Sequence, residues 1–519
     1  MATDFRNEPF TDFTRPENAE KMRAAIEKVR GQLGQTYPLI IGGREITTAA
    51  TMLESTNPAN PSQVVGRFPN ATVEQANEAI EAADEAFKTW SRVPAKERAD
   101  LVFRVADILR QRKFELSAWL IFEVSKSWAE ADADIAELID FAEYYARQML
   151  KLAGPQEVVP YPGEKPELRY IPLGVGAVIP PWNFAGAIMG GMTLATIVAG
   201  NTAVLKPAST SPTIAAQFMR ILKEAGLPDG VVNFLTGPGG AIGDALVDHP
   251  RTRFIAFTGS KEIGMRIFER ASKVHPGQIW LKRTILEMGG KDSIVVDETA
   301  DLDAAADGIT ASAFGFQGQK CSACSRAIIV DSVYDKVLEK VVERTKKLTM
   351  GDPTDPANYM GAVIDDKAFK KITDYIKIGS KEGKLVLGGE TSDGKNGYFI
   401  PPTIIKDVAP DARISQEEIF GPVLAFIKAK DFDEALQIAN NTEFGLTGSV
   451  YSKDRSRLDR AKDEFHVGNL YLNRKCTGAL VGVHPFGGFN MSGTDSKAGG
   501  PDYLLLFTQA KSISEKVGP

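Results

Sequence analysis

The chain of 519 residues is 43% hydrophobic and 25% charged, which is typical of a globular protein and excludes a disordered chain, a collagen or a coiled-coil rod. Its length predicts roughly two to four domains. A net charge of −6 gives no general attraction to nucleic acid or to an anionic membrane, so we expect neither as a partner.

The cysteine and histidine content indicates the compartment. Three cysteines form no disulfide framework, and only four histidines are present, so we expect a reducing compartment and no metal site. The first 18 residues are acidic and contain no apolar run, which is unlike a secretory or mitochondrial leader. The prediction is a cytoplasmic protein without a presequence.

The first third of the chain is predicted to be mostly helical. Thr72 and Gln75 have the spacing of a capping box, and apolar residues then recur every three or four positions. The other elements expected here are a charged surface helix at 19–34, short strands near 38–46, and helices at 95–112 and 115–150.

After these helices the pattern changes. Residues 158–171 alternate around a Pro-Gly-Glu turn and predict a β-hairpin. Strand and helix patterns alternate from 174 to 271 and again from 292 to about 473, which predicts parallel sheets covered by helices. A last short strand is expected at 503–507.

The stretch 171–205 contains no charged side chain and is long enough to cross a bilayer. Two adjacent prolines, Asn183 and several glycines interrupt it, and no basic flank marks a cytoplasmic side. We therefore interpret this stretch as a buried strand, a loop and a buried helix.

Single motifs indicate a dinucleotide site only weakly. No Gly-x-Gly-x-x-Gly follows a predicted strand in the alternating region. Gly259 and Ser260 instead end a strand and begin a helix, where backbone N–H groups suit a phosphate, with a plain strand-to-helix turn as an equal alternative. Lys206 follows another strand, at the edge where ligands bind in parallel sheets, unless it is simply solvated.

Cys321 is the candidate nucleophile. It lies among small residues, and the neighbouring Lys320 would favour the reactive thiolate. With Cys324 it forms a C-x-x-C, but a redox or zinc site would need a second pair or a thioredoxin-like context. The alternative is a pair of buried structural thiols.

Glu287 and Asn183 are the other candidate catalytic side chains. Glu287 stands between apolar residues and two glycines, so desolvation would raise its pKa towards that of a general base, unless it pairs with Lys291 at the surface. Asn183 is a polar side chain in a long uncharged stretch and could donate to a ligand oxyanion, or cap the helix that follows.

Seven short motifs occur in an order that resembles the aldehyde dehydrogenase superfamily, from about residue 38 to the end of the chain. The motifs are PWN at 181–183, KP at 206–207, FTGS at 257–260, EMGGK at 287–291, GQKC at 318–321, EIFGP at 418–422 and PFGG at 485–488. The runs GQKCSACSR at 318–326 and TGALVG at 477–482, with the helical N-terminal arm, resemble the branch that oxidises L-glutamate γ-semialdehyde. The resemblance is to its stand-alone bacterial form, without a fused proline dehydrogenase.

The resemblance implies an α/β fold with three parts. These are an N-terminal arm with a Rossmann-type NAD-binding domain at 1–157 and 173–287, an α/β catalytic domain at 288–483, and a small β oligomerisation element at 158–172 and 484–519. It also implies a homodimer or larger homo-oligomer, because a hairpin without a core of its own needs a partner surface.

The resemblance also implies a role for each catalytic candidate. Cys321 would attack the aldehyde carbon to give a thiohemiacetal. The Asn183 amide and the Cys321 backbone N–H would hold the oxyanion. After hydride transfer to the nicotinamide, Glu287 would activate water to hydrolyse the thioester.

The implied cofactor is NAD. The residues that would contact it are Ile179, Pro180, Trp182, Lys206, Ser209, Gly240, Thr258, Gly259, Ser260, Ile263, Gly289, Glu418 and Phe420. Ser209 stands where many NAD-specific relatives carry a glutamate that bonds the ribose hydroxyls. A serine does not repel a 2′-phosphate, so we expect NAD as the main cofactor with some use of NADP.

The implied reaction is oxidation of L-glutamate γ-semialdehyde to L-glutamate, the second step of proline degradation, with functional coupling to a separate proline dehydrogenase. The implied substrate contacts are Lys320, Ser322, Gly478, Ala479 and Phe486, of which Ser322 and the backbone amides at 478–479 would hold the α-carboxylate.

Three alternatives remain open. One is a dehydrogenase of another semialdehyde, such as succinate semialdehyde. The second is a cysteine-dependent esterase or acyltransferase, which would turn over without NAD and would leave the cofactor features unexplained. The third is a structural protein that has kept the fold, which the intact Cys321, Glu287 and Asn183 disfavour.

Overall fold

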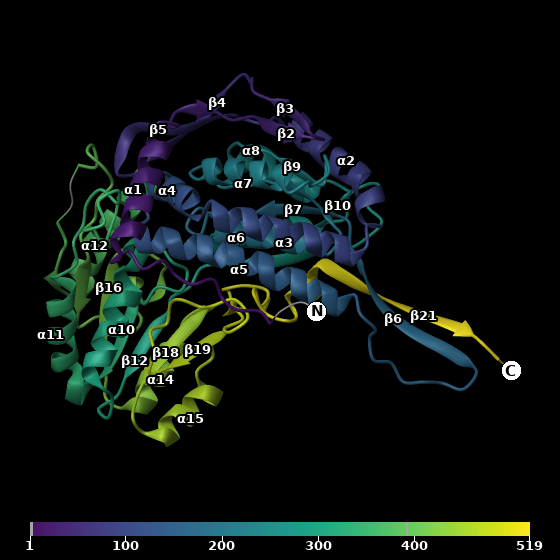
Figure 1. Ribbon diagram of the computed structural model, residues 1–519. Coiled ribbons are helices and arrows are strands. Elements are labelled where there is room, and N and C mark those ends of the chain that lie inside the picture. Colours follow the sequence, from purple (N-terminus) through teal and green to yellow (C-terminus); the bar gives the residue numbers. More distant parts are fainter. Residues whose placement is uncertain (1–3, 391–392, 519) are drawn as a thin grey trace.

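Two α/β bodies lie side by side, and a two-stranded ribbon projects from the first of them, as the computed structural model shows for residues 4–390 and 393–518 (Figure 1). Each body contains a seven-stranded sheet with helices packed against it. At Ala241 only the backbone is described. The α/β fold that the resemblance implies, with parallel sheets covered by helices, is thus observed.

The first body contains a mostly parallel sheet in the order β11-β10-β7-β8-β9-β2-β3. Its strands are β2 (Leu39–Ile41), β3 (Arg44–Ile46), β7 (Val175–Ile179), β8 (Thr202–Leu205), β9 (Val232–Phe234), β10 (Thr252–Thr258) and β11 (Arg283–Glu287). Its helices are α2 (Val73–Trp90), α3 (Ala95–Gln111), α4 (Lys113–Val124), α5 (Trp128–Leu152), α6 (Ala187–Val198), α7 (Pro212–Glu224), α8 (Gly239–Asp248) and α9 (Lys261–Ala271).

The strand order of this sheet reverses between β7 and β10. The chain runs outward from β7 to β8 and β9 and then returns to place β10 beside β7, with Phe257 opposite Ile179. Strands β7 to β11 are parallel to one another. In such sheets ligands bind outside the carboxyl ends of the strands at the point of reversal.

The second body contains a sheet in the order β14-β15-β16-β13-β12-β18-β19, in which only the edge strand β14 is antiparallel to its neighbour. The strands are β12 (Ser293–Val296), β13 (Arg326–Val330), β14 (Lys384–Leu387), β15 (Thr403–Lys406), β16 (Val423–Ala429), β18 (Thr447–Tyr451) and β19 (Asn469–Leu472). The helices are α10 (Leu302–Phe314), α11 (Tyr334–Thr345), α12 (Asp366–Glu382), α13 (Arg413–Gln416), α14 (Phe432–Asn440) and α15 (Arg455–Glu464).

The remaining elements lie outside the two seven-stranded sheets. They are α1 (Pro16–Arg30), the sheet of β1 (Gln35–Thr36), β4 (Met52–Asn57) and β5 (Asn60–Pro69), the pair β17 (Phe444–Gly445) and β20 (Phe489–Asn490), and the short 3₁₀ turns η1 (Gly315–Gly318), η2 (Asp331–Val333) and η3 (Tyr503–Phe507). Strands β4 and β5 were not foreseen. They arch over the outer side of the first body (Figure 1).

The predicted helices are confirmed with one correction. Thr72 caps α2, and Gln75 closes the capping box. The helix expected at 115–150 is two helices, α4 and α5, because Ser125 adopts a left-handed conformation with φ of 58°. The uncharged stretch 171–205 forms β7, α6 and β8, and no helix in the described part of the chain is long and apolar enough to span a membrane.

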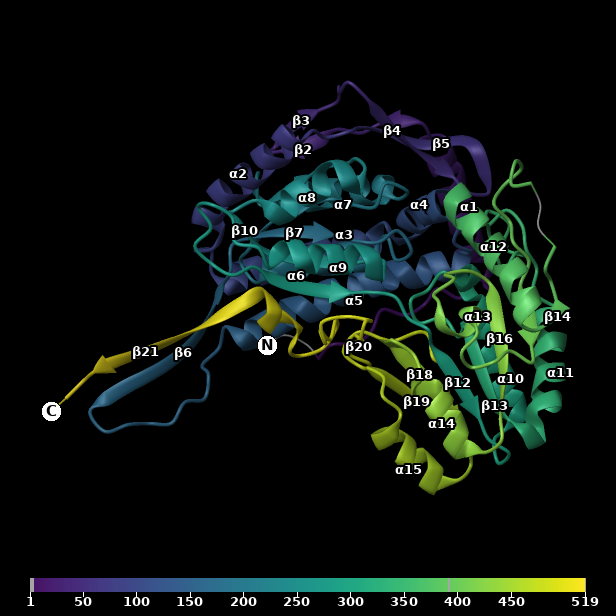
Figure 2. The same ribbon diagram turned by 180° about the vertical axis from the view of Figure 1, so that it is seen from behind.

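The predicted hairpin at 158–171 is wrong. Residues 164–172 form a single strand, β6 (Glu164–Pro172), which pairs antiparallel with β21 (Thr508–Lys516) from the far end of the chain. The strand expected at 503–507 is the 3₁₀ turn η3, and the true strand begins directly after it. In both views this β6–β21 ribbon extends away from the two bodies (Figures 1 and 2).

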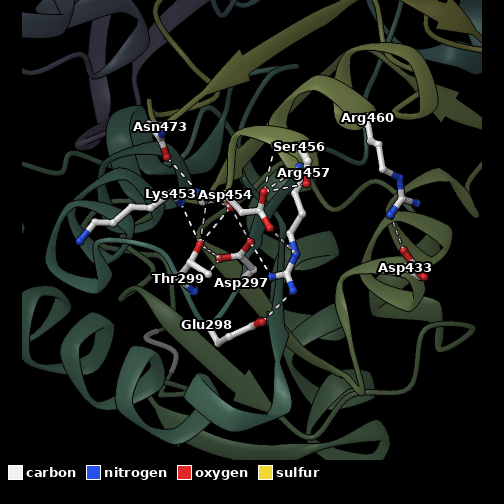
Figure 3. Close-up of polar contacts among 11 residues, drawn as sticks. Asp297, Glu298, Thr299, Asp433, Lys453, Asp454, Ser456, Arg457, Arg460 and Asn473 are labelled. Atoms are coloured by element: carbon white, nitrogen blue, oxygen red, sulfur yellow. Dashed lines mark hydrogen bonds and ion pairs between the residues drawn. The ribbon is translucent and has the colours of Figure 1, made fainter.

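The carboxyl edge of the second sheet is tied together by Arg457 of α15 (Figure 3). Its guanidinium bonds Asp297 at 2.9 Å and Glu298 at 2.8 Å, and the fully buried Asp297 also accepts from the backbone N–H of Thr299. Asp454 caps α15. Because these residues follow β12 and β18, they lie at the edge of the sheet opposite to the loop before β13, and their role is structural.

We expect Gly190→Ala to lower the free energy of unfolding by about 1–3 kcal/mol, because helices α5 and α6 touch there. A Cβ at Gly190 would lie 2.0 Å from Cδ1 of Leu138. Chemical denaturation measures the loss. In a double-mutant cycle with Leu138→Ala the two losses should be less than additive, since the space for the new methyl is then present. Strict additivity would contradict the contact.

Candidate active site

The two sheets are joined by a short crossing segment, residues 288–292, and the candidate site forms around it. Strand β11 ends at Glu287, at the carboxyl edge of the first sheet, and β12 begins at Ser293, at the amino edge of the second. A Cβ at Gly290 would lie 2.4 Å from the backbone oxygen of Cys321. The segment therefore passes directly against the candidate nucleophile, and only a glycine fits there.

The loop that carries Cys321 holds a strained conformation. Phe316 and Gln317 both have positive φ, at 49° and 56°. The Gln317 side chain donates to the carbonyls of Ser125 at 3.1 Å and Ala362 at 2.8 Å, which fixes this conformation from outside the loop. Strain that the surroundings enforce is common at functional sites, where it presents a side chain in one orientation.

Asn183 reaches this loop instead of capping a helix. Its side-chain amide is buried and donates to the carbonyl of Gln319 at 3.0 Å, two residues before Cys321. An amide nitrogen carries two hydrogens, so one bond fixes the group and the second hydrogen remains for a ligand. Helix α6 is capped by Asp134 of α5, which accepts from the Ala187 N–H at 2.6 Å, so the capping alternative for Asn183 is wrong.

The Cys321 thiol is partly exposed, and its surroundings disfavour the thiolate. Burial raises its pKa well above the usual range, and the carboxyl groups of Asp292, Glu287 and Glu418 raise it further. Lys320, which was expected to favour the thiolate, instead pairs with Glu130 of α5 at 2.7 Å. In these surroundings the candidate nucleophile is therefore a neutral thiol at pH 7.

Glu287 is buried at the end of β11 and does not pair with Lys291. Burial raises its pKa to about 8, against the opposing effects of a hydrogen bond from Ser496 and the charge of Lys497. Lys291 is also buried, its Nζ has no hydrogen-bond partner among the described residues, and burial lowers its pKa to about 7. The desolvated carboxyl group foreseen for a general base is present.

The side chain of Cys324 lies in a different environment from that of Cys321. Its side chain is fully buried in the core of the second body, and its Sγ donates to the carbonyl of Arg326 at 3.5 Å. No group of three or more His, Cys, Asp or Glu side chains that could hold a metal ion occurs in the part of the chain that the structure describes. The two cysteines of the C-x-x-C therefore do not form one site: Cys321 is the candidate nucleophile, and Cys324 is a thiol of the core.

The residues expected at the cofactor all lie along the carboxyl edge of the first sheet or on the loop that faces it. Those at the ends of β7, β8 and β10 and at the starts of α8 and α9 are Ile179, Pro180, Trp182, Lys206, Ser209, Gly240, Thr258, Gly259, Ser260 and Ile263. Gly289 is in the crossing segment, and Glu418 and Phe420 follow α13. The structure brings this set together at the point where the strand order reverses.

These residues fit a dinucleotide. Helix α8 begins without a side-chain cap, and a Cβ at Gly239 or Gly240 would meet nothing within 4 Å, so the space beside these two residues is open. Such a helix start binds phosphate. Lys206 is buried directly after β8, and burial lowers the pKa of its ammonium to about 8. A bound anion near this ammonium would raise that pKa again.

The opposite end of this edge suits a flat ring and a ribose. Trp182 packs edge-to-face on Phe420, with ring centroids 5.5 Å apart. Glu418 accepts from the Gly290 N–H at 3.0 Å, and a Cβ at Gly289 would lie 2.4 Å from its carboxyl oxygens. Gly289 therefore allows this carboxyl group to approach the crossing segment.

The residues expected at the substrate come from two loops that share one hydrogen bond. The buried Ser322 accepts at its carbonyl from Cys476 Sγ at 3.4 Å, and Cys476 stands just before Gly478 and Ala479. Phe486 is half-buried and is fixed by two backbone hydrogen bonds of 2.8 Å to Ala498. Lys320 precedes Cys321 and is held by its pair with Glu130.

The sequence reasoning missed the residues that support the site from a distance. Lys126 and Asp134 form a fully buried pair at 2.8 Å, and the Lys126 ammonium lies 4.4 Å from the ring centre of Phe184 and 4.7 Å from that of Phe316. This pair ties α5 to the Cys321 loop. Asp134 lies in α5 and Lys126 in the break before it, and neither residue stands in a recognisable motif, so no local signal could have revealed the pair.

Comparison with known proteins agrees with this geometry. The aldehyde dehydrogenase family model matches residues 46–513, and the chain belongs to that family. A 1-pyrroline-5-carboxylate dehydrogenase from Geobacillus kaustophilus is 62% identical over 515 residues, which cover 99% of this chain and all of the relative.

Solved structures are similar over the same range. A 1-pyrroline-5-carboxylate dehydrogenase from Thermus, crystallised with bound NAD, superposes with a TM-score of 0.97 at 52% identity and 99% coverage of both chains. Proline utilization A from Bdellovibrio bacteriovorus superposes with a TM-score of 0.97 at 47% identity, over 99% of this chain and 53% of that longer one.

Alkylation of Cys321 by iodoacetamide should increase about tenfold per pH unit up to and beyond pH 9, because only the thiolate reacts and the pKa is raised. Mass spectrometry of the modified peptide gives the rate. Glu287→Gln removes one nearby negative charge, so its curve should level off at lower pH. A wild-type rate that is already pH-independent below pH 8 would contradict the neutral thiol.

Proposed function

We propose that the protein oxidises L-glutamate γ-semialdehyde, which equilibrates with 1-pyrroline-5-carboxylate, to L-glutamate with reduction of NAD. One observation carries this proposal: Cys321, Asn183 and Glu287, from three distant stretches of chain, meet where the carboxyl edge of a dinucleotide-type sheet faces the amino edge of the second sheet. The names of the full-length relatives supply the substrate.

In the proposed reaction the Cys321 thiol loses its proton to water, and the resulting thiolate sulfur bonds to the aldehyde carbon. The aldehyde oxygen becomes an oxyanion between the second hydrogen of the Asn183 amide and the Cys321 N–H. Each hydrogen-bond donor aimed at such a charge lowers the barrier by about 3 kcal/mol. NAD, when bound at the carboxyl edge of the first sheet, would supply the hydride acceptor that turns this tetrahedral centre into a thioester. Glu287 then takes a proton from water, which attacks the thioester and frees the product acid and the thiol.

Several chain residues would hold the cofactor. Lys206 and the start of α8 would contact phosphate and ribose, and Glu418 would accept from the hydroxyls of the nicotinamide ribose. The Ser209 hydroxyl donates to the carbonyl of Gly237 at 3.2 Å. Because residue 209 is a serine, it has no carboxylate that would repel a 2′-phosphate. NAD is therefore the main cofactor in this proposal, with NADP admitted more weakly.

The α-carboxylate of the substrate would bind between Ser322 and the backbone amides of Gly478 and Ala479. Gly478 has φ of 75°, which a residue with a side chain rarely adopts, so the loop conformation depends on it. Phe486 would pack on the aliphatic carbons, and Lys320 would lie nearby. This arrangement favours glutamate semialdehyde over succinate semialdehyde.

We also propose a homo-oligomer built through the β6–β21 ribbon. A two-stranded ribbon has no core of its own, and Val159 and Tyr161 beside it are 87% and 67% exposed.

The three cysteines are unpaired, which supports a reducing compartment and hence the cytoplasm. The match to half of proline utilization A supports functional coupling to a separate proline dehydrogenase.

The test of the proposed function is NADH formation, followed at 340 nm with 1-pyrroline-5-carboxylate as substrate. We expect turnover by the wild-type protein and loss of at least about a thousandfold in Cys321→Ser, because the hydroxyl is a far weaker nucleophile than the thiolate. Hydrolysis of an ester at full rate without NAD, and no NADH, would show a cysteine hydrolase instead.

The substrate contact has its own test. Ser322→Ala should lower kcat/KM for glutamate semialdehyde by about tenfold or more, since it removes one hydrogen bond to a charged carboxylate worth about 1.5–3 kcal/mol. Propionaldehyde, which has no such carboxylate, is the matched control and should lose little. Equal losses on both aldehydes would contradict the assignment.

A further inference from the structure

The carboxyl group of Glu287 is held by the C-terminal tail. The Ser496 hydroxyl donates a short hydrogen bond to Oε1, and Ser496 itself is buried. Oε2 is buried and has no hydrogen-bond partner among the described residues. The two oxygens of this carboxyl group are thus in different situations: one is fixed and the other is free.

The tail is folded tightly against the end of β11. The Met288 N–H donates to the carbonyl of Ser492 at 2.7 Å, and the Thr494 N–H donates to the carbonyl of Leu286 at 3.0 Å. These bonds place residues 492–496 alongside the strand that ends at Glu287. The backbone pairing therefore fixes the position of Ser496 and holds its hydroxyl next to the carboxyl group of Glu287.

Lys497 is fixed next to the same group. Its ammonium donates to the carbonyl of Gly468 at 2.8 Å and to that of Gly487. A Cβ at Gly487 would lie 2.8 Å from Oε1 of Glu287, so the backbone that binds the ammonium also touches the carboxyl group. Lys497 cannot rotate away without breaking both bonds.

The other titratable groups that face Glu287 are few. Asp495 lies on the tail and opposes ionisation of Glu287. Cys321 and Tyr503 face it from the loop before β13 and from η3. Lys497 is thus the positive charge among these neighbours that favours the carboxylate.

We propose that Ser496 and Lys497 are positioning residues for Glu287 as general base: Ser496 fixes Oε1 so that Oε2 alone receives the proton, and Lys497 stabilises the ionised carboxylate. The inference rests on the proposed function, because it concerns the hydrolysis of the thioester. It extends the site to a pair of residues in the glycine-rich tail that had no assigned role.

Oε2 takes a proton from water as the water oxygen bonds to the thioester carbon. The C–S bond breaks, the electron pair stays on sulfur, and the proton on Glu287 returns to that sulfur to regenerate the thiol. No oxidant or reductant takes part, since the hydride has already left.

The experiment measures the acyl-enzyme on Cys321 by rapid acid quench and intact mass spectrometry, with NAD and 1-pyrroline-5-carboxylate, between pH 6 and pH 10. In Ser496→Ala the pKa of Glu287 rises, so the pH at which hydrolysis reaches half its maximum should increase by about one pH unit. Near pH 7 this slows hydrolysis about tenfold, and the acyl-enzyme accumulates.

The first turnover of NADH should remain unchanged in Ser496→Ala, because hydride transfer precedes the step that Glu287 assists. Lys497→Gln should shift the hydrolysis profile in the same direction, and Lys497→Arg, which keeps the charge, should restore it. Thr494→Val is the matched control: its hydroxyl accepts from the Leu286 N–H at 3.0 Å and does not bond Glu287, so the profile should stay in place.

An unshifted profile in Ser496→Ala, or an equal shift in Thr494→Val, would overturn the inference. Thermal unfolding of each variant establishes that it is folded. If Ser496→Ala is unfolded, the comparison of the hydrolysis profiles of Lys497→Arg and Lys497→Gln decides the inference on its own. If the wild-type protein gives no first turnover of NADH, the proposed function fails, and this outcome is distinct from an unshifted profile with a normal first turnover.

Discussion

The site depends on the short crossing between two sheets. Because β11 ends at Glu287 and β12 begins at Ser293, the carboxyl edge of one sheet is fixed against the amino edge of the other. Parallel strands place their carboxyl ends on a common edge, so everything that follows β7, β8 and β10 is brought to the same crossing. Gly289 and Gly290 permit this close approach, since a Cβ at either would collide with Glu418 or with the Cys321 backbone.

Around the crossing, charged groups have been taken out of water and held by partners from elsewhere in the fold. Lys126 and Asp134 form one such pair, and breaking a buried pair costs about 3–5 kcal/mol because it leaves one charge unpaired. Asp134 also caps α6, so the same carboxyl group fixes the helix after Asn183. The strained Cys321 loop is kept in place by this support.

The charges around Cys321 disfavour the thiolate form of its side chain. Burial and three carboxyl groups keep Cys321 as a thiol, while burial keeps Glu287 largely protonated below about pH 8. Both groups therefore require a change in their surroundings before they react. A bound cofactor with a cationic ring would supply this change for Cys321. For Glu287, Ser496 and Lys497 already oppose the rise in its pKa that burial causes.

The sequence by itself determined most of the local elements and indicated the candidate reacting groups. Apolar periodicity located α2 and the alternating strands and helices, and the order of seven motifs indicated the family and singled out Cys321, Glu287 and Asn183. It could not find the pairing of β6 with β21, the break at Ser125, or the hold of Ser496 on Glu287. These depend on contacts between residues hundreds of positions apart, as for Glu287 and Ser496, whose separation is 209 residues. Local pattern carries no information on which distant segment packs against a strand, because that choice is made by the free energy of the whole fold.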